Sequence, residues 1–179
     1  LGDKITSIGS YAFGECKLLT KISIPDSVTS LGDYAFSSCE ALAEVEMGNG
    51  MREIGAYAFR GCRGLTSLSI PASVETVGKH AFYGMEKATL FCEAESIPPY
   101  WNERWNSSYR AVLWGVSFSE EGFVESFTMT ESATENLTAP GATLSPRRVG
   151  YTFLGWSAEA GSDEIAYAPS ELASCPVGT

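Results

Sequence analysis

A block of 23 residues occurs three times in the first part of the chain, and a fourth, degraded copy follows. The complete copies span residues 5–27, 28–50 and 51–73, and the fourth covers 74–93. The copies share small and apolar residues in register, namely Gly9/Gly32/Gly55/Gly78, Ala12/Ala35/Ala58/Ala81, Phe13/Phe36/Phe59/Phe82, Cys16/Cys39/Cys62 and Leu19/Leu42/Leu65. Blocks this short bury an apolar face only by stacking on their neighbours. Residues 1–93 are therefore predicted to form a solenoid.

Each block contains one predicted strand. In residues 19–24, Ile22 and Ile24 alternate with Ser23, as a half-buried strand requires. Pro25 and Pro71 end two of these strands, and the glycine-rich turn at 48–50 ends the other. One strand per coil, always in the same direction, predicts a parallel sheet whose outward positions include Ser23 and its repeats.

The other side of each coil is predicted to hold short helices or 3₁₀ turns. Ala12, Phe13, Cys16 and Leu19 have helical spacing over one or two turns. A helical segment would place these four side chains on one face, against the inner face of the sheet.

The repeats resemble the BspA-like class of the leucine-rich-repeat superfamily, whose unit reads roughly V-x-x-I-G-x-x-A-F-x-x-C-x-x-L-x-x-I-x-I-P. Residues 5–25 and 28–47 follow this pattern nearly position by position. The fourth copy departs from it, because Met85 replaces the cysteine, Ala88 replaces the leucine, and one residue is missing before Leu90. A terminal repeat is expected to be atypical, since one of its faces has no neighbour.

Residues 94–116 are predicted to cap the solenoid. Trp101 and Trp105 are four residues apart, so a helical turn would place both indoles over the open end of the last coil. Residues 111–114 would add a strand to the sheet. In the alternative, Trp101, Trp105, Tyr109 and Trp114 form a platform on which sugar rings stack.

From about residue 117 the repeat is lost, and residues 117–179 resemble the Listeria–Bacteroides repeat. This is a small β-rich module of bacterial surface proteins, for which a β-grasp-like fold is one expectation. The residues that carry the resemblance are Pro146, Gly150, Tyr151, Phe153, Gly155 and Trp156, with Tyr167 in a later strand. The resemblance implies a third domain, which is expected to be truncated at the end of the chain.

Composition excludes several function classes. The chain has 12 basic and 22 acidic residues, a net charge of −10, so nucleic acid and anionic lipid are not expected partners. No run approaches the ~18 apolar residues of a membrane span, so direct membrane insertion is not expected either.

The cysteines and the one histidine do not indicate a catalytic or metal site. Cys16, Cys39 and Cys62 are expected to form a ladder of free thiols inside the stack, and no C-x-x-C pair occurs. His80 occupies the position that tyrosine holds in the other repeats. Neither a metal nor a cofactor is predicted, and the chain is not expected to be an enzyme.

The predicted binding surface is the outward face of the strands. Its residues are Lys21, Ser23, Glu44, Glu46, Ser67 and Ser69. The family resemblance implies an extracellular or bacterial cell-surface location and adhesion to a protein or glycoprotein of a host or neighbouring cell. Two alternatives stay open: a carbohydrate-binding module that uses exposed aromatic residues, and a purely structural spacer.

Overall fold

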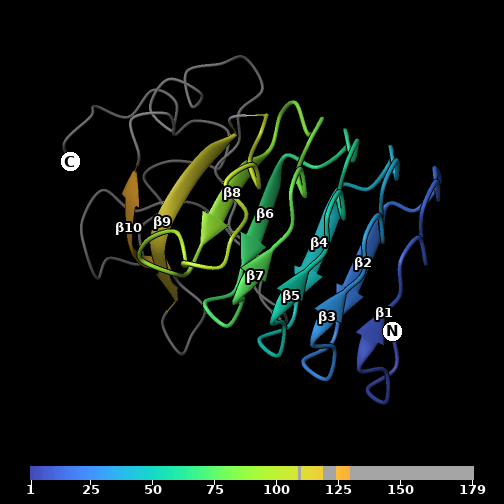
Figure 1. The fold of residues 1–179 in the computed structure, drawn as a ribbon, viewed down its shortest axis with the longest axis horizontal. Coiled ribbons are helices and arrows are strands. Elements are labelled where there is room, and N and C mark those ends of the chain that lie inside the picture. Colours follow the sequence, from blue (N-terminus) through green and yellow to red (C-terminus); the bar gives the residue numbers. More distant parts are fainter. Residues whose placement is uncertain (109, 119–123, 130–179) are drawn as a thin grey trace, which may run out of the picture.

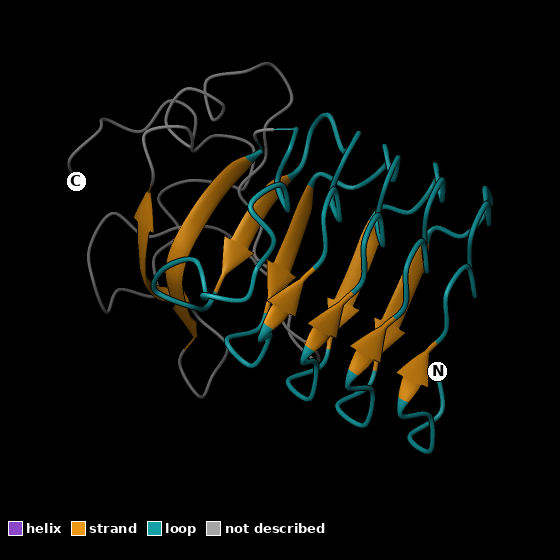
Figure 2. Cartoon of the chain, viewed as in Figure 1, coloured by secondary structure: helices purple, strands orange, loops and turns teal. Residues whose placement is uncertain are grey.

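The computed structural model describes residues 1–108, 110–118 and 124–129, and everything said of the structure concerns these ranges. In them the chain winds into a solenoid built of strands and loops (Figures 1 and 2). Long strands line one side: β2 (Lys21–Ile24), β4 (Glu44–Met47), β6 (Ser67–Ile70), β8 (Thr89–Cys92), β9 (Ala111–Phe118) and β10 (Val124–Met129). Two-residue strands line the other: β1 (Ser7–Ile8), β3 (Ser30–Leu31), β5 (Glu53–Ile54) and β7 (Thr76–Val77). The solenoid prediction is confirmed.

The strands of successive coils run parallel, and their register follows the sequence repeat. In the short-strand sheet, of order β1-β3-β5-β7, partners such as Leu31 and Ile54 are 23 residues apart. On the long-strand side, Leu68 in β6 pairs with Leu90 in β8, an offset of only 22 residues. The register therefore confirms the missing residue in the fourth repeat. β4 and β6 lie side by side in Figure 1, although β2 pairs only with β4, and β6 begins a separate sheet with β8, β9 and β10.

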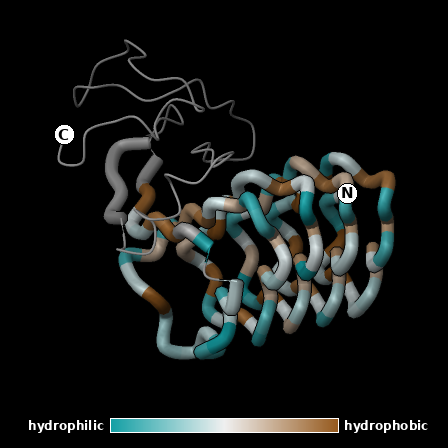
Figure 3. The backbone as a smooth tube through the Cα atoms, turned by 90° about the horizontal axis from the view of Figure 1, so that it is seen from above, coloured by the Kyte–Doolittle hydropathy of each residue, from teal (hydrophilic) through white to brown (hydrophobic). Residues whose placement is uncertain are grey.

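One hydrophobic core fills the space between the two sides. Phe36, Phe59 and Phe82 are completely buried, and their rings stack along the solenoid axis at centroid distances of 5.4 and 6.0 Å. Inward residues of both strand sets, for example Ile54 and Leu68, join the same cluster. Figure 3 shows hydrophobic and hydrophilic stretches in every coil. The buried residues are those at the repeated apolar positions of the sequence.

Each coil of the repeat has two strands, so the prediction of one strand per coil is wrong. The second strand pairs over only two residues, as at Glu53 and Ile54, and a glycine follows it directly. Alternation over two residues is too short a pattern to identify a strand. The pairing exists because the neighbouring coil has the two corresponding residues of its own repeat in register with these.

The predicted short helices and 3₁₀ turns are also absent from the described residues, where turns take their place. The reason is that consecutive N–H groups have different acceptors. The amide of Ala12 donates to the carbonyl of Gly9 within its own coil, at 3.2 Å, but the amide of Phe13 donates to Ala35 of the next coil, at 2.8 Å. Left-handed backbone at Tyr11, with φ of 59°, and at the corresponding position of every later coil also breaks the helical geometry.

Beyond β8 the chain completes a further turn and adds a strand. β9 pairs in parallel with β8, as the sequence predicts for residues 111–114. Trp101 and Trp105 are buried without forming a helix. The ring of Trp105 meets Phe82 edge to face, at 5.8 Å and 89°, and the Trp101 indole N–H donates to the Val74 carbonyl at 3.2 Å.

The predicted module at 117–179 falls almost entirely outside the described residues. Only the end of β9 and strand β10 belong to it, and β10 pairs antiparallel with β9. The residues that carry the resemblance, from Pro146 to Tyr167, are not among those described. This part of the domain prediction stays a prediction.

The repeated glycine is a requirement of close stacking between coils. A Cβ atom on Gly55 would lie 2.6 Å from the backbone nitrogen of Asp33, and a Cβ on Gly32 or Gly78 would come as near to the preceding coil. At Gly9, the same position in the first coil, a Cβ would meet nothing within 4 Å.

We expect Gly55→Ala to destabilise the fold by about 1–3 kcal/mol or more, because the backbone of two coils must move apart. Gly9→Ala is the matched control and is expected to change the free energy of unfolding by less than ~0.5 kcal/mol. Urea unfolding followed by circular dichroism measures both. Equal effects of the two substitutions would show that close stacking is not the reason for the glycine.

Candidate functional site: the outer faces of the strands

Alternation along the long strands sends one set of side chains out of the core. In β2, Ile22 and Ile24 are buried, while Lys21 is exposed and Ser23 is partly exposed. The parallel register brings Lys21 opposite Glu44 and Ser23 opposite Glu46. Four of the six predicted binding residues therefore lie together on adjacent strands.

Lys21 lies between two carboxylates of the next coil. Its Nζ atom is 2.8 Å from Oε1 of Glu46 and 3.1 Å from Oε2 of Glu44. The hydrogen bond to Glu46, and then that to Glu44, raise the pKa of the Lys21 amine above its ordinary value. The cluster is partly solvated, with the Lys21 side chain 53% exposed and the Glu46 side chain 18% exposed. These three residues form a charged patch of fixed geometry, in which both carboxylates share one ammonium group.

Ser67 and Ser69, the other two predicted binding residues, are not on the accessible surface. They occupy the corresponding outward positions of β6 but are only 2% and 6% exposed. The next outward residues, Thr89 and Phe91 in β8, are also buried. The accessible part of the predicted surface is therefore restricted to β2 and β4. Local alternation gave no signal of this difference between coils.

The tryptophans do not form an exposed platform. Trp101, Trp105 and Trp114 are 7%, 5% and 6% exposed, and they pack on one another at centroid distances of 4.7 to 6.0 Å. Tyr109, the fourth aromatic residue of the alternative, lies outside the described residues. These three rings serve to fill the core next to the last coil.

The described cysteines are free and mostly inaccessible. Cys39 and Cys62 are buried, and each thiol donates a hydrogen bond to a carbonyl of the preceding coil, Phe13 or Phe36, at 3.0 and 3.1 Å. Burial raises the pKa of the Cys62 thiol to about 12. It also raises the pKa of Cys39, and that of Cys92 well above the ordinary value. Cys16, in the first coil, is exposed, and Cys175 lies outside the described residues.

His80 continues a ladder of stacked tyrosines, as the repeat predicts. Tyr11, Tyr34 and Tyr57 stack at 4.8 Å with nearly parallel rings, and His80 follows Tyr57 at 5.1 Å with a tilt of 35°. Its Nδ1 atom lies 2.5 Å from Oγ of Ser107, a contact that sequence reasoning missed because the spacing of 27 residues departs from the repeat. Within the described residues, no group of three or more His, Cys, Asp or Glu side chains could hold a metal ion.

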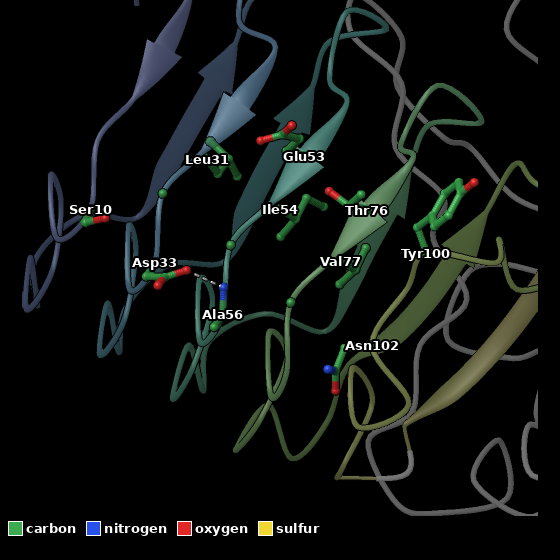
Figure 4. Close-up of a pocket in the computed structure, with 13 residues that line it drawn as sticks. Ser10, Leu31, Asp33, Glu53, Ile54, Ala56, Thr76, Val77, Tyr100 and Asn102 are labelled. Carbon is green, nitrogen blue, oxygen red and sulfur yellow. Dashed lines mark hydrogen bonds between the residues drawn. The ribbon is translucent and has the colours of Figure 1, made fainter.

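A groove on the short-strand side was not predicted from the sequence. It has a volume of about 570 Å³ and crosses β3, β5 and β7. Figure 4 shows Asp33 toward one end, Tyr100 and Asn102 toward the other, and Glu53 on the coil between them, well separated from Asp33. These residues come from different coils and have no common motif, so only the stacked structure brings them together.

The described part of the chain has no helix long and apolar enough to cross a membrane.

Comparison with known proteins gives one family. The model of the BspA type leucine rich repeat region matches residues 1–100, in six copies. No curated protein matches the chain.

Several solved structures are similar. A leucine-rich-repeat protein from T. pallidum is 28% identical with a TM-score of 0.51, over 59% of this chain and 48% of that one. A leucine-rich cell surface protein from Faecalibacterium prausnitzii is 32% identical with a TM-score of 0.49, over 51% of this chain and 24% of that one. A leucine-rich-repeat protein from Bacteroides capillosus is 34% identical with a TM-score of 0.43, over 48% of this chain and 63% of that one. The chain thus spans less than two thirds of the length of each of these structures.

The difference in exposure between the cysteines predicts that an alkylating reagent modifies them at different rates. In a Cys175→Ala background at pH 8, iodoacetamide is expected to modify Cys16 rapidly, and the buried Cys39, Cys62 and Cys92 only after unfolding. Mass spectrometry of peptides from timed samples measures this, and Cys16→Ala removes the rapid reaction. Labelling of Cys62 as fast as that of Cys16 would contradict the buried ladder.

The raised thiol pKa values also predict a dependence of stability on pH. Because the folded-state pKa of Cys62 lies above that of the unfolded chain, its contribution is complete below about pH 9 and is lost as pH rises toward about 12. The loss is about 1.4 kcal/mol per pH unit for one thiol. The stability difference between the natural chain and Cys62→Ala should therefore shrink across this range. A constant difference in urea unfolding from pH 8 to 11 would contradict it.

Proposed function

The chain belongs to the BspA type leucine-rich-repeat family, and from this premise we propose that it is a non-enzymatic interaction scaffold at the bacterial cell surface or outside the cell. The proposed activity is adhesion to a protein or glycoprotein of a host or neighbouring cell. The cell-surface location rests on the resemblance of the repeats to BspA-like proteins.

The observation that supports a binding role is the accessible charged patch of Lys21, Glu44 and Glu46 on β2 and β4. Its side chains project from strands that are held by pairing on one side and by the core on the other. The backbone of strands held in this way loses little conformational entropy when a partner binds. The two carboxylates and one ammonium group favour a partner surface that carries both basic and hydrogen-bonding groups.

The size of the patch limits the affinity. Adjacent strands are ~4.8 Å apart, so the two strands offer far less than the ~800 Å² per partner of a standard interface. We expect dissociation constants in the micromolar range or weaker for this surface alone.

The two alternatives are distinguished by different observations. A carbohydrate-binding role through Trp101, Trp105 and Trp114 is disfavoured, because these rings are buried. A structural spacer has no ligand, and its outward strand residues are replaceable without effect on adhesion.

The test is a binding screen of the immobilised chain against extracellular-matrix proteins, mucins and a glycan array. The variant Lys21→Gln/Glu44→Gln/Glu46→Gln removes the charged patch and keeps similar side-chain size. We expect it to lose at least tenfold in affinity for any protein partner, while its unfolding free energy stays close to that of the natural chain because exposed ion pairs contribute little.

The matched control is Arg52→Gln/Glu75→Gln, which removes an exposed ion pair, 3.6 Å between Arg52 Nε and Glu75 Oε1, outside the patch. This control should bind as the natural chain does. Equal binding by the triple variant would contradict a role for the patch, and absence of binding by every form would favour the spacer.

A further inference from the structure

Part of the lining of the groove on the short-strand side carries no side chain. Gly32, Gly55 and Gly78 belong to this lining in successive coils. Each is glycine because a Cβ would collide with the backbone of the preceding coil. The requirement of close stacking therefore leaves a row of bare backbone on the outside of the solenoid, along which a ligand can approach closely.

The charged residues that line the groove are both acidic. Asp33 and Glu53 are exposed lining residues from adjacent coils, and none of the described residues that line the groove is basic. The Oδ1 atom of Asp33 accepts a hydrogen bond from the amide of Ala56 at 2.7 Å, which fixes the carboxylate and leaves its other oxygen for a ligand. The net charge of −10 adds a long-range attraction for cations.

An aromatic ring lies toward the other end of the groove. Tyr100 is 76% exposed, although most large aromatic residues of the solenoid are buried or stacked. An exposed phenol ring attracts a guanidinium or ammonium group through its face. Asn102, two residues further along the chain, also lines the groove and adds an amide that can donate and accept hydrogen bonds.

The dimensions suit a short extended peptide. The groove crosses three strands, that is two steps of ~4.8 Å, and extended chain rises ~3.3 Å per residue. About three residues therefore span the distance, and the volume of about 570 Å³ falls in the usual range for small ligands.

We propose that this groove binds a short, extended, cationic segment of a partner protein. One Arg or Lys side chain of the segment pairs with Asp33, a second pairs with Glu53, and a third lies on the ring of Tyr100. The site is on the opposite side of the core from Lys21, Glu44 and Glu46, so the inference is independent of the adhesive surface proposed above.

The probe is a fluorescein-labelled tri-arginine peptide, with a tri-glutamine peptide of the same length as the uncharged comparison. Fluorescence anisotropy at low salt, about 0.02 M, limits the screening of exposed charges. We expect the tri-arginine peptide to bind the full chain, with affinity falling as salt is raised, and the tri-glutamine peptide not to bind.

Asp33→Asn/Glu53→Gln tests the site, since asparagine keeps the oxygen that accepts the Ala56 amide. We expect it to weaken binding at least tenfold. The matched control, Glu40→Gln/Glu86→Gln, removes the same number of exposed carboxylates from outside the groove and should weaken binding less than twofold. Tyr100→Ala should weaken binding several-fold, and Tyr100→Phe should restore it.

Three outcomes would overturn the proposal. Equal losses in the two double variants would show that the peptide responds only to the net charge. If the chain does not bind tri-arginine at low salt, the groove is not a binding site for cationic peptides. Binding of neutral oligosaccharides that depends on Tyr100, without binding of tri-arginine, would assign the groove to sugars. Thermal unfolding of each variant establishes that it is folded.

Discussion

The distance between neighbouring coils is the constraint on which the rest of the structure depends. Gly32, Gly55 and Gly78 bring the backbones so close that a Cβ atom at any of them would approach the preceding coil to 2.4–2.6 Å. At this separation the strands pair in parallel and the aromatic rings of successive coils reach stacking distance. Amides of the turns also donate across to the next coil instead of closing helical turns. The glycine row, the ring ladders and the absence of helix in the described ranges are therefore consequences of one spacing.

The same constraint decides where function can differ between coils. Inward and stacked positions must repeat, because each residue contacts its own counterpart in the next coil. Outward positions have no such restriction, and they carry the variation: lysine, glutamate and serine at Lys21, Glu44 and Ser67, for example. The chemical character of a solenoid surface is therefore set by which residues occupy the same outward position in successive coils. Both proposed surfaces consist of such positions.

The sequence predicts the features that repeat and misses those that arise between coils. Periodicity predicted the solenoid, the inward side chains, the parallel register and the missing residue before Leu90, because each follows from the alignment of the copies. The spacing of Ala12, Phe13, Cys16 and Leu19 suggested a helix, since spacing alone does not show that every second amide donates to another coil. The groove depends on segments distant in sequence, so no local pattern contains it. The low exposure of Ser67 and Ser69 departs from the alternation along the strand, which therefore gives no signal of it.

At the far end of the described solenoid the aromatic rows change orientation. Parallel rings from Phe13 to Phe82 present a face to each successive coil, and a face accepts another ring. Trp105 meets Phe82 at 89°, edge to face, so the parallel stacking does not continue from Phe82 to Trp105. The tyrosine row changes in a similar way, because His80 is tilted by 35° from Tyr57 and the rings of His80 and Tyr83 meet at 73°. In both rows the last ring contact within the described residues is therefore edge to face, a change of orientation that needs no change from aromatic side chains to another class.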